Sequence, residues 1–231
     1  MNNALMDWSV LLPEIVLASG ICVLLVLDLF VRDSARDLSY LLAIFLLAGV
    51  AWVLIGTSPE STAQLAAGGA YVADDLARVL KLFAVTAVAT VFLYSRPWLR
   101  SRKLHFGEYY VLGLFGLLGV MVLASGYSLL VSYIGLEILS LSLYAMVAFD
   151  RDSARSAEAA MKYFVLGAIA SGTLLYGMSL IYGITGTLQI AELQTTIAAK
   201  SEVVGLWVGL GFIVVGVAFK FGAVPFHMWV P

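Results

Sequence analysis

Four ionisable side chains stand inside or beside long apolar stretches of the sequence, where charge is costly. They are Glu137, Lys162, Lys220 and His227. A charged side chain near the centre of a bilayer costs about 2.5–3.5 kcal/mol on insertion scales, so each of them needs a partner or a water-filled pocket. Carboxyl, amine and imidazole groups in such places are suited to passing protons, and proton transfer is the chemistry they indicate first.

Glu137 is the deepest of the four. It has about ten residues of apolar sequence on either side, which at 1.5 Å per helical residue places it about 15 Å from each end. Ser132, Ser140, Ser142 and Tyr144 give the same stretch a polar component. A carboxyl at this depth indicates a functional group, and the alternative is a protonated glutamate that only fixes helix packing.

Lys162 lies near the start of the next apolar stretch, four residues after Glu158. This spacing allows an ion pair on one helix face. A lysine that snorkels to the membrane surface is the alternative to a functional role. The helices of Glu137 and Lys162 should be neighbours, but the two positions differ by about 10 Å in depth. The sequence therefore favours coupling through water or helix tilt over direct contact.

Lys220 ends an apolar run and precedes a predicted helix break. Pro225 lacks a backbone N–H and disfavours helical angles at Val224, and Gly222 adds freedom, so the helix should break between Phe221 and Pro225. Broken helices at membrane depth line a cavity or are buried in protein, and transporters build ion sites with them. The alternative is a lysine that snorkels from the helix end.

His227 follows this break. Its imidazole titrates near neutral pH when unperturbed, which suits a proton relay. A structural histidine is the alternative, and the sequence does not decide between the two.

Arg78 and Lys81 form a further charged group, near the outer end of the third apolar stretch. Asp74 and Asp75 precede Arg78 by four and three residues, so local ion pairs are available. We expect an ion-pair cluster at the membrane interface rather than part of the site.

The composition is that of a membrane protein. Of 231 residues, 62% are hydrophobic and 12% charged, whereas soluble domains have about half and about a quarter. The net charge of -2 gives no sign of nucleic-acid binding. The one cysteine, Cys22, cannot form an intramolecular disulfide or hold an iron–sulfur cluster, and we expect it to be a small core residue.

Seven apolar stretches are long enough to cross a hydrocarbon core of about 30 Å as helices. They cover residues 9–31, 38–57, 74–95, 108–125, 127–149, 157–183 and 203–221. The sequence therefore predicts an all-α, polytopic transmembrane helical bundle of about seven spans, whose last helix is broken near Phe221–Pro225. The more polar stretch 186–202 is expected to form a short helix on the outer face.

Small residues recur at spacings that allow helices to approach closely. They are Gly113, Gly116 and Gly119 in the fourth stretch, Gly167 and Ser171 in the sixth, and Gly205 and Gly209 in the seventh.

Lysine and arginine placement predicts that the N-terminus lies outside the cell. The loops that would then be cytoplasmic hold Arg32, Arg36, Arg96, Arg100, Arg102, Lys103, Arg151 and Arg155, together with His105. The opposite loops hold only Lys200. This asymmetry follows the positive-inside rule.

Six segments resemble membrane subunit N of the proton-pumping NADH–quinone oxidoreductases, the respiratory complex I family. They are LLPEIVL at 11–17, LDLF at 27–30, EILSLSLY at 137–144, DRDS at 150–153, EAAMKYF at 158–164 and FKFGAVPFHMW at 219–229. The last motif is shared across the antiporter-like superfamily, whereas the first and the Met-Lys segment favour subunit N.

The resemblance implies a role for each candidate residue. Glu137 is similar to the family's fifth-helix glutamate, a proton carrier. Lys162 matches the sixth-helix lysine that modulates it, Lys220 the central carrier on the broken seventh helix, and His227 the histidine after the break. The family's function is to couple quinone reduction elsewhere in the complex to proton pumping through a Glu/Lys half-channel.

The resemblance also implies partners and location. The chain itself would bind no cofactor, because NADH, FMN, the iron–sulfur clusters and quinone are bound by other subunits in this family. Its partners would be other membrane subunits of complex I and lipid, with neither nucleic acid nor a soluble substrate. It would be a multi-pass protein of the bacterial plasma membrane, the inner membrane where there are two.

The expected organisation has two parts. Residues 1–105 would hold three N-terminal transmembrane helices, and residues 106–231 the first antiporter-like repeat, incomplete at its C-terminus. The family continues for several hundred residues with a second, inverted repeat, so we expect this sequence to be a fragment or a truncated product.

Two other functions fit the same residues. One is a subunit of a multi-subunit sodium/proton antiporter, which shares the broken-helix motif. The other is a structural membrane spacer whose charges only fix helix register.

Overall fold

Long apolar helices account for most of the chain, and their packing divides it into two compact units. A computed structural model describes residues 8, 10–30, 37–56, 64–102, 104, 107–199 and 203–230. The first unit comprises Met1–Gly126 with Ile134–Met146, and the second Tyr127–Tyr133 with Val147–Pro231. The middle of one helix thus belongs to the first unit and its start to the second.

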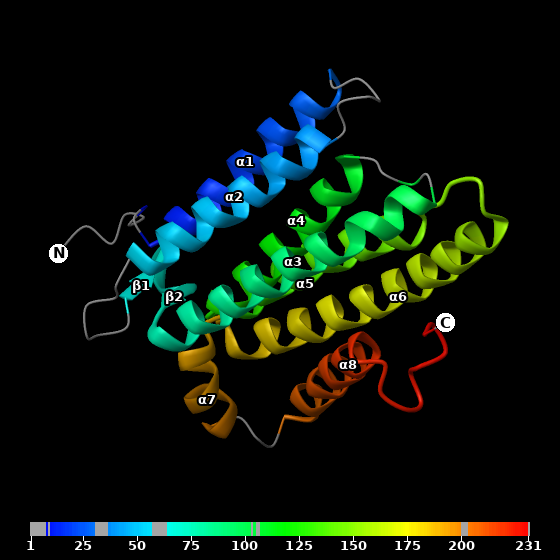
Figure 1. Cartoon of the computed structure of the whole chain (residues 1–231). Helices are drawn as coiled ribbons and strands as arrows, with labels where there is room; N and C mark the ends of the chain where they lie inside the picture. The colour runs from blue at the N-terminus through cyan, green and yellow to red at the C-terminus, as the bar shows by residue number, and fades with distance from the viewer. Residues whose placement is uncertain are drawn as a thin grey trace. The chain divides into compact units, whose positions relative to one another are not determined.

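The first unit holds four complete helices, most of a fifth and a small hairpin (Figure 1). The helices are α1 (Leu12–Asp28), α2 (Asp37–Gly56), α3 (Asp75–Ser101), α4 (Gly107–Ser125) and α5 (Leu129–Val147). The hairpin comprises β1 (Gln64–Ala66), the 3-10 turn η2 (Ala67–Gly69) and β2 (Tyr71–Ala73). It connects α2 to α3, and Tyr71 pairs with Gly126 just after α4.

Apolar side chains fill the centre of the first unit and also cover its outside. The ring of Tyr110 lies 5.5 Å from that of Tyr40 and 5.1 Å from that of Phe92, all three being buried. On α2, Phe45 and Trp52 are 72% and 79% exposed. Large aromatic side chains on the outside of a helix are typical of a surface that faces lipid or another apolar protein.

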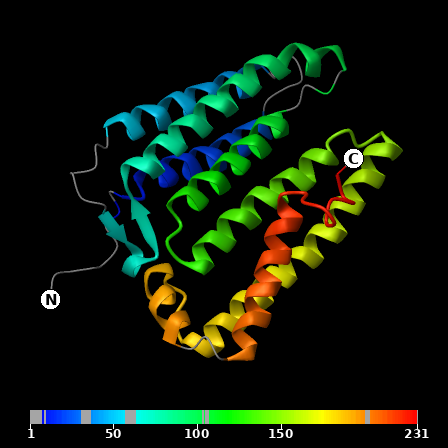
Figure 2. The ribbon, with the colours of Figure 1, turned by 90° about the horizontal axis from the view of Figure 1, so that it is seen from below.

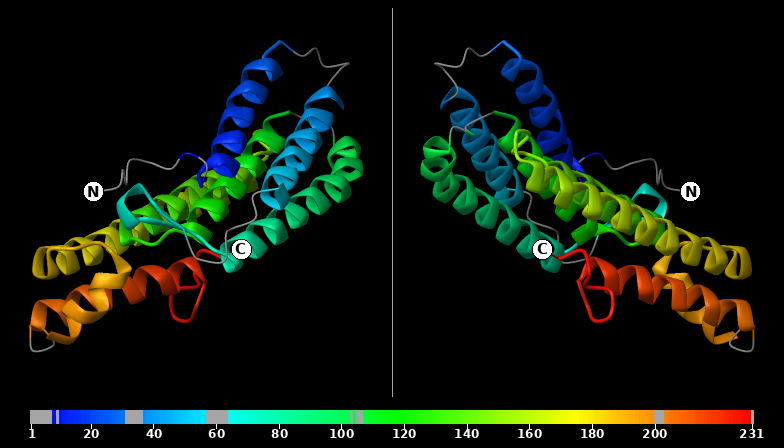
Figure 3. Two further views of the ribbon diagram at one scale, coloured as in Figure 1. Left: turned by 90° about the vertical axis from the view of Figure 1, so that its left-hand side faces the viewer. Right: turned by 90° about the vertical axis from the view of Figure 1, so that its right-hand side faces the viewer.

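The second unit consists mainly of two helices that pack along each other. They are α6 (Ala154–Thr185) and α8 (Val204–Lys220), with the short α7 (Ile190–Ala199) between them in sequence. Figures 2 and 3 show α6 in yellow and α8 in orange lying side by side. Leu193 anchors α7 by packing against Ile181 and Leu206.

Glycines allow the backbones of α6 and α8 to meet. A Cβ added at Gly177 would lie 2.7 Å from the carbonyl oxygen of Gly209, and one at Gly209 would lie 3.2 Å from the carbonyl oxygen of Gly177. The Gly205/Gly209 spacing thus marks a real close approach, as small residues do between membrane helices. The glycines of the fourth stretch do the same, because a Cβ at Gly119 would lie 2.7 Å from the carbonyl oxygen of Gly135.

The Gly177→Ala substitution is expected to destabilise the protein by about 1–3 kcal/mol, because the new methyl group meets backbone atoms that cannot move aside. Gly172 provides a matched control on the same helix, since a Cβ there has no atom within 4 Å. The Gly172→Ala substitution should be neutral or stabilising. Thermal unfolding in detergent measures both, and equal midpoints for the two variants would contradict the packing described.

The predicted helices are confirmed in type and approximate position. Among the described residues, five helices are long and apolar enough to cross a membrane, and Val204–Lys220 is a shorter apolar helix. The stretch 186–202 contains α7, as predicted, and the last apolar helix ends at Lys220. The number of spans, the outside position of the N-terminus and the two-part organisation at residue 105 stay predictions.

Several residues that support the predicted orientation lie outside the described part of the chain. They are Arg32, Arg36, Lys103, His105 and Lys200. The expectation for Cys22 is wrong, because its side chain is exposed. The buried stripe of α1 runs through Leu17, Ile21 and Leu24, and Cys22 lies off this stripe by one residue.

Candidate functional site

Lys220 is the last residue of α8 and is held by a serine of α6. Its Nζ donates a hydrogen bond of 2.9 Å to the hydroxyl of Ser171, which is 5% exposed. A neutral hydroxyl thus serves as an acceptor for the lysine. The sequence predicts Ser171 only as a small packing residue, and its bond to Lys220 was not predicted.

The break after Lys220 is made by a glycine in a left-handed conformation. Gly222 has φ 63, and its N–H donates to Phe219 at 2.9 Å while that of Ala223 donates to Ala218 at 2.9 Å. This pair of bonds is a Schellman motif, which closes a helix with glycine just past its end. The predicted break is therefore confirmed, with Gly222 ending the helix and Pro225 following it.

The segment after the break packs against α6 and the end of α8, within the second unit. The indole Nε1 of Trp229 donates to the carbonyl of Phe219 at 2.9 Å. Its ring stacks on Tyr163 of α6 with centroids 4.6 Å apart. The side chain of His227 is exposed. The relay role of His227 stays a prediction.

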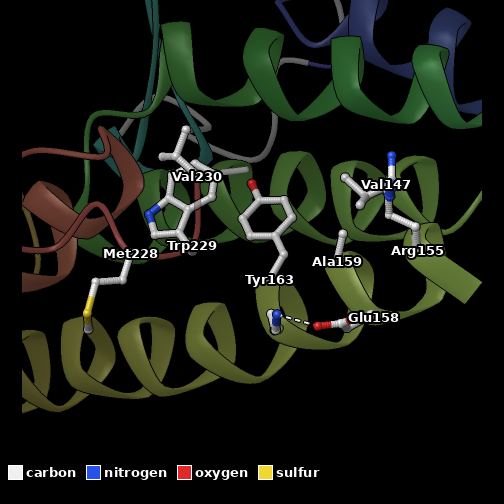
Figure 4. A pocket seen from close by; sticks show the side chains of 9 residues that line it. Val147, Arg155, Glu158, Ala159, Tyr163, Met228, Trp229 and Val230 are labelled. Atoms are coloured by element: carbon white, nitrogen blue, oxygen red, sulfur yellow. Dashed lines mark hydrogen bonds and ion pairs between the residues drawn. The ribbon is translucent and has the colours of Figure 1, made fainter.

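Lys162 makes the local ion pair that its spacing predicts. Its Nζ lies 2.5 Å from Oε1 of Glu158, and both side chains are about two-thirds exposed, at 66% and 67%. Both line a cavity of about 320 Å³. The cavity lies between α6 and the C-terminal segment, with Tyr163 and Trp229 against each other and the pair marked by a dashed line (Figure 4).

Glu137 is partly buried on α5, in the portion that belongs to the first unit. The nearby hydroxyls of Ser140 and Ser142 donate to carbonyls of their own helix, at 2.7 Å and 2.8 Å. Lys162, Lys220 and His227 belong to the second unit. The coupling of Glu137 to a lysine stays a prediction.

The expectation for Lys81 is wrong. It is buried, and its Nζ lies 2.7 Å from Oε1 of Glu14 on α1, with side chains 4% and 8% exposed. The same ammonium donates a hydrogen bond of 2.9 Å to the hydroxyl of Tyr71. Lys81 follows Asp75 by six residues, beyond the three or four over which helix side chains meet. That spacing was the signal against a local pair.

The rest of the Asp74–Arg78 segment behaves as a surface cluster. Arg78 pairs with Asp75 at 3.4 Å. Asp74 accepts a hydrogen bond of 2.7 Å from the backbone N–H of Ala77 and so caps the start of α3. The expected ion pair is confirmed for Arg78, and Asp74 has a capping role in addition.

A second polar cluster lies at the opposite end of α3. Asp37 at the start of α2 pairs with Arg96 at 3.1 Å and also with Arg100. The guanidinium of Arg96 lies 4.4 Å from the centre of the Tyr40 ring. The start of α3 is thus paired with α1 through Lys81, and its end is paired with α2 through Arg96 and Arg100. Within the described ranges, no group of three or more His, Cys, Asp or Glu side chains is placed to hold a metal ion.

These features define a polytopic helical membrane protein of the antiporter-like class, with a lysine at a helix break. A family model described as NADH:quinone oxidoreductase/Mrp antiporter, TM, matches residues 126–231. The chain belongs to the family of NADH-quinone oxidoreductase subunit N. It is 54% identical to that subunit from Thioalkalivibrio sulfidiphilus, over 97% of this chain and 47% of the relative.

Solved structures share the fold. A chain of respiratory complex I from Thermus thermophilus with bound aureothin is 30% identical, with a TM-score of 0.74 over 95% of this chain and 46% of that one. A chain of the Mrp complex from Dietzia sp. has a TM-score of 0.73 at 20% identity, which shows the fold alone. The chain spans about half the length of the curated relatives that it matches.

Proposed function

We propose that this chain is part of a proton-translocating membrane-arm subunit of NADH–quinone oxidoreductase. It would couple quinone reduction, which takes place elsewhere in the complex, to proton pumping. Family membership supports this proposal, and the observation that carries it is the position of Lys220. An amine at the end of a membrane helix, with a buried hydroxyl as its neighbour, is a group that can hold and release a proton.

The hydroxyl of Ser171 matters because it is a neutral acceptor and not a carboxylate. A carboxylate at 2.9 Å would hold the lysine in its charged form, since an opposite charge nearby favours ionisation. A serine hydroxyl accepts the same hydrogen bond without a formal charge. The Ser171 hydroxyl thus positions Lys220 without adding a charge of its own.

Glu137, Lys162, Lys220 and His227 would form one half of a proton path. An ammonium near Glu137 would favour the carboxylate, and its withdrawal would favour the protonated acid. The Lys162–Glu158 pair supplies an alternative position for the Lys162 charge, because an exposed pair is held weakly. Energy would arrive from other subunits as an electrostatic or conformational signal.

The remaining parts of the proposal follow from the same family. NADH, FMN, iron–sulfur clusters and quinone would be bound by other subunits. The partners would be other membrane subunits of complex I, and the chain would reside in the bacterial inner membrane as a multi-pass protein. The redox reaction would not take place within it.

Glu137→Gln in the complete complex tests this function. NADH-driven proton movement into membrane vesicles is expected to fall by about tenfold or more, in the range for loss of a positioned proton carrier. Glu192→Gln is the matched control, since Glu192 is an exposed glutamate of α7 that accepts a hydrogen bond from Thr187 and has no role in the path. An assembled complex that pumps normally with glutamine at position 137 would contradict the proposal.

The same vesicles separate the other functions. Proton movement that depends on sodium and needs no NADH would identify a sodium/proton antiporter subunit. Variants in which the charges of Glu137 and Lys162 are exchanged would distinguish a structural spacer, because only a spacer would keep full activity.

A further inference from the structure

The buried Glu14–Lys81 pair has no role in the proposed path. It lies on α1 and α3, outside the residues 126–231 that the family model matches. Burying two charges costs about as much as their attraction returns, so such a pair is weak evidence for a stabilising role. An ionisable residue inside a membrane protein is more often part of an ion or proton site.

Four elements of the first unit surround this pair. Glu14 lies in the first turn of α1. Lys81 comes from α3 and Tyr71 from β2, and Ser125 ends α4 with no exposed surface. Burial, together with the Glu14 charge, raises the pKa of Tyr71. The phenol therefore keeps its proton.

The geometry brings an amine and a carboxyl, which can exchange a proton, together with a phenol hydroxyl that bonds to the amine. The Lys81 ammonium lies 2.7 Å from Glu14 Oε1 and 2.9 Å from the Tyr71 oxygen. Because Tyr71 accepts from the lysine, its own O–H stays available to donate. In the predicted orientation, the starts of α1 and α3 and the hairpin face the outside of the cell.

We propose that Glu14, Lys81 and Tyr71 form a second proton-exchange site, on the outer side of the three N-terminal helices. A transfer from Lys81 to Glu14 breaks one N–H bond and forms one O–H bond, which leaves two neutral groups. The acid then loses its proton to water, and the amine takes up another. This inference rests on the proposed function, because it assumes that the chain moves protons.

The experiment uses the complete complex in native membranes, with Glu14→Gln and Lys81→Gln introduced together. The double change leaves no buried ion without a partner, so the complex should assemble. NADH-driven proton movement is expected to fall by about tenfold. Redox-difference infrared spectra of the unaltered complex are expected to show the deuterium-sensitive carbonyl band of a protonated carboxyl. In the double variant, the contribution of Glu14 to this band should be absent.

A matched control lies one turn earlier on α3. Asp75→Asn combined with Arg78→Gln removes a surface ion pair of the same helix and should leave both the band and the pumping unchanged. Normal pumping and an unchanged band in the Glu14/Lys81 double variant would show that the pair is structural and would overturn the inference.

A gentler variant covers a failure of the double variant to assemble. Tyr71→Phe removes only the hydroxyl, and it should shift the carboxyl band and slow pumping; an unshifted band with normal pumping would overturn the site. Glu137→Gln keeps the two proposals apart. If Glu137→Gln stops pumping and the Glu14/Lys81 double variant does not, only the site at Glu14 and Lys81 is refuted. If the double variant stops pumping and Glu137→Gln does not, only the path through Glu137 is refuted.

Discussion

Lys220→Ala is expected to stop NADH-driven proton movement, lowering its rate by about 100-fold in an assembled complex. The change removes the amine at the end of α8 and leaves the Ser171 hydroxyl without its 2.9 Å donor. The helix end itself should survive, because the bonds that close it involve only backbone atoms around Gly222. Fluorescent pH indicators in vesicles measure the rate, and immunoblots of the membranes measure assembly.

Ser171→Ala is the matched variant for this prediction. It keeps the amine and removes one neutral acceptor, which is worth about 1 kcal/mol, so the rate should change by less than about tenfold. A Lys220→Ala complex that assembles and pumps at the normal rate would remove the central residue from the proposed path. Equal losses of pumping rate in the two variants would mean that the hydrogen bond between Lys220 and Ser171 matters, rather than the amine itself.

Lys81→Met alone is expected to destabilise the protein by about 3–5 kcal/mol, because it leaves the Glu14 carboxylate buried without its partner. Methionine is close to lysine in length and fills the same space, so the loss would come from charge. The amount of complex that assembles, and the thermal midpoint of what does, would both fall.

Arg78→Met supplies the comparison on the same helix. Arg78 pairs with Asp75, whose side chain is 81% exposed, and a pair of this kind contributes about 0–1 kcal/mol. Equal stability of the Lys81→Met and Arg78→Met variants would contradict this prediction. It would show that breaking the buried pair costs no more stability than breaking the surface pair. Adding Glu14→Gln to Lys81→Met should restore most of the lost stability.

The sequence predicted the helices well because the bilayer imposes their length. A stretch such as 108–125 has few ways to satisfy its backbone in lipid other than a helix, and α4 runs over Gly107–Ser125. The break after Lys220 was also predictable, since Gly222 and Pro225 act within a few residues of it. In both cases the cause is local in the sequence.

Partners on other helices were not predictable in this way. Lys81 was assigned to nearby aspartates, although its partner Glu14 lies 67 residues away on α1. Ser171 was predicted to be a small packing residue, although it accepts a hydrogen bond from a lysine 49 positions later. Helix periodicity says which side chains share a face, but which helix that face meets depends on tertiary packing.

The glycine contact between α6 and α8 has a consequence for how charge could move. Because the backbones meet at Gly177 and Gly209, neither helix can slide past the other without separating main chains that are already in contact. The fixed part is then the pair of helices, and the moving part is the flexible four-carbon stem of Lys220. Charge displacement in the second unit would then be a rotamer change of the Lys220 side chain, while α6 and α8 stay in place.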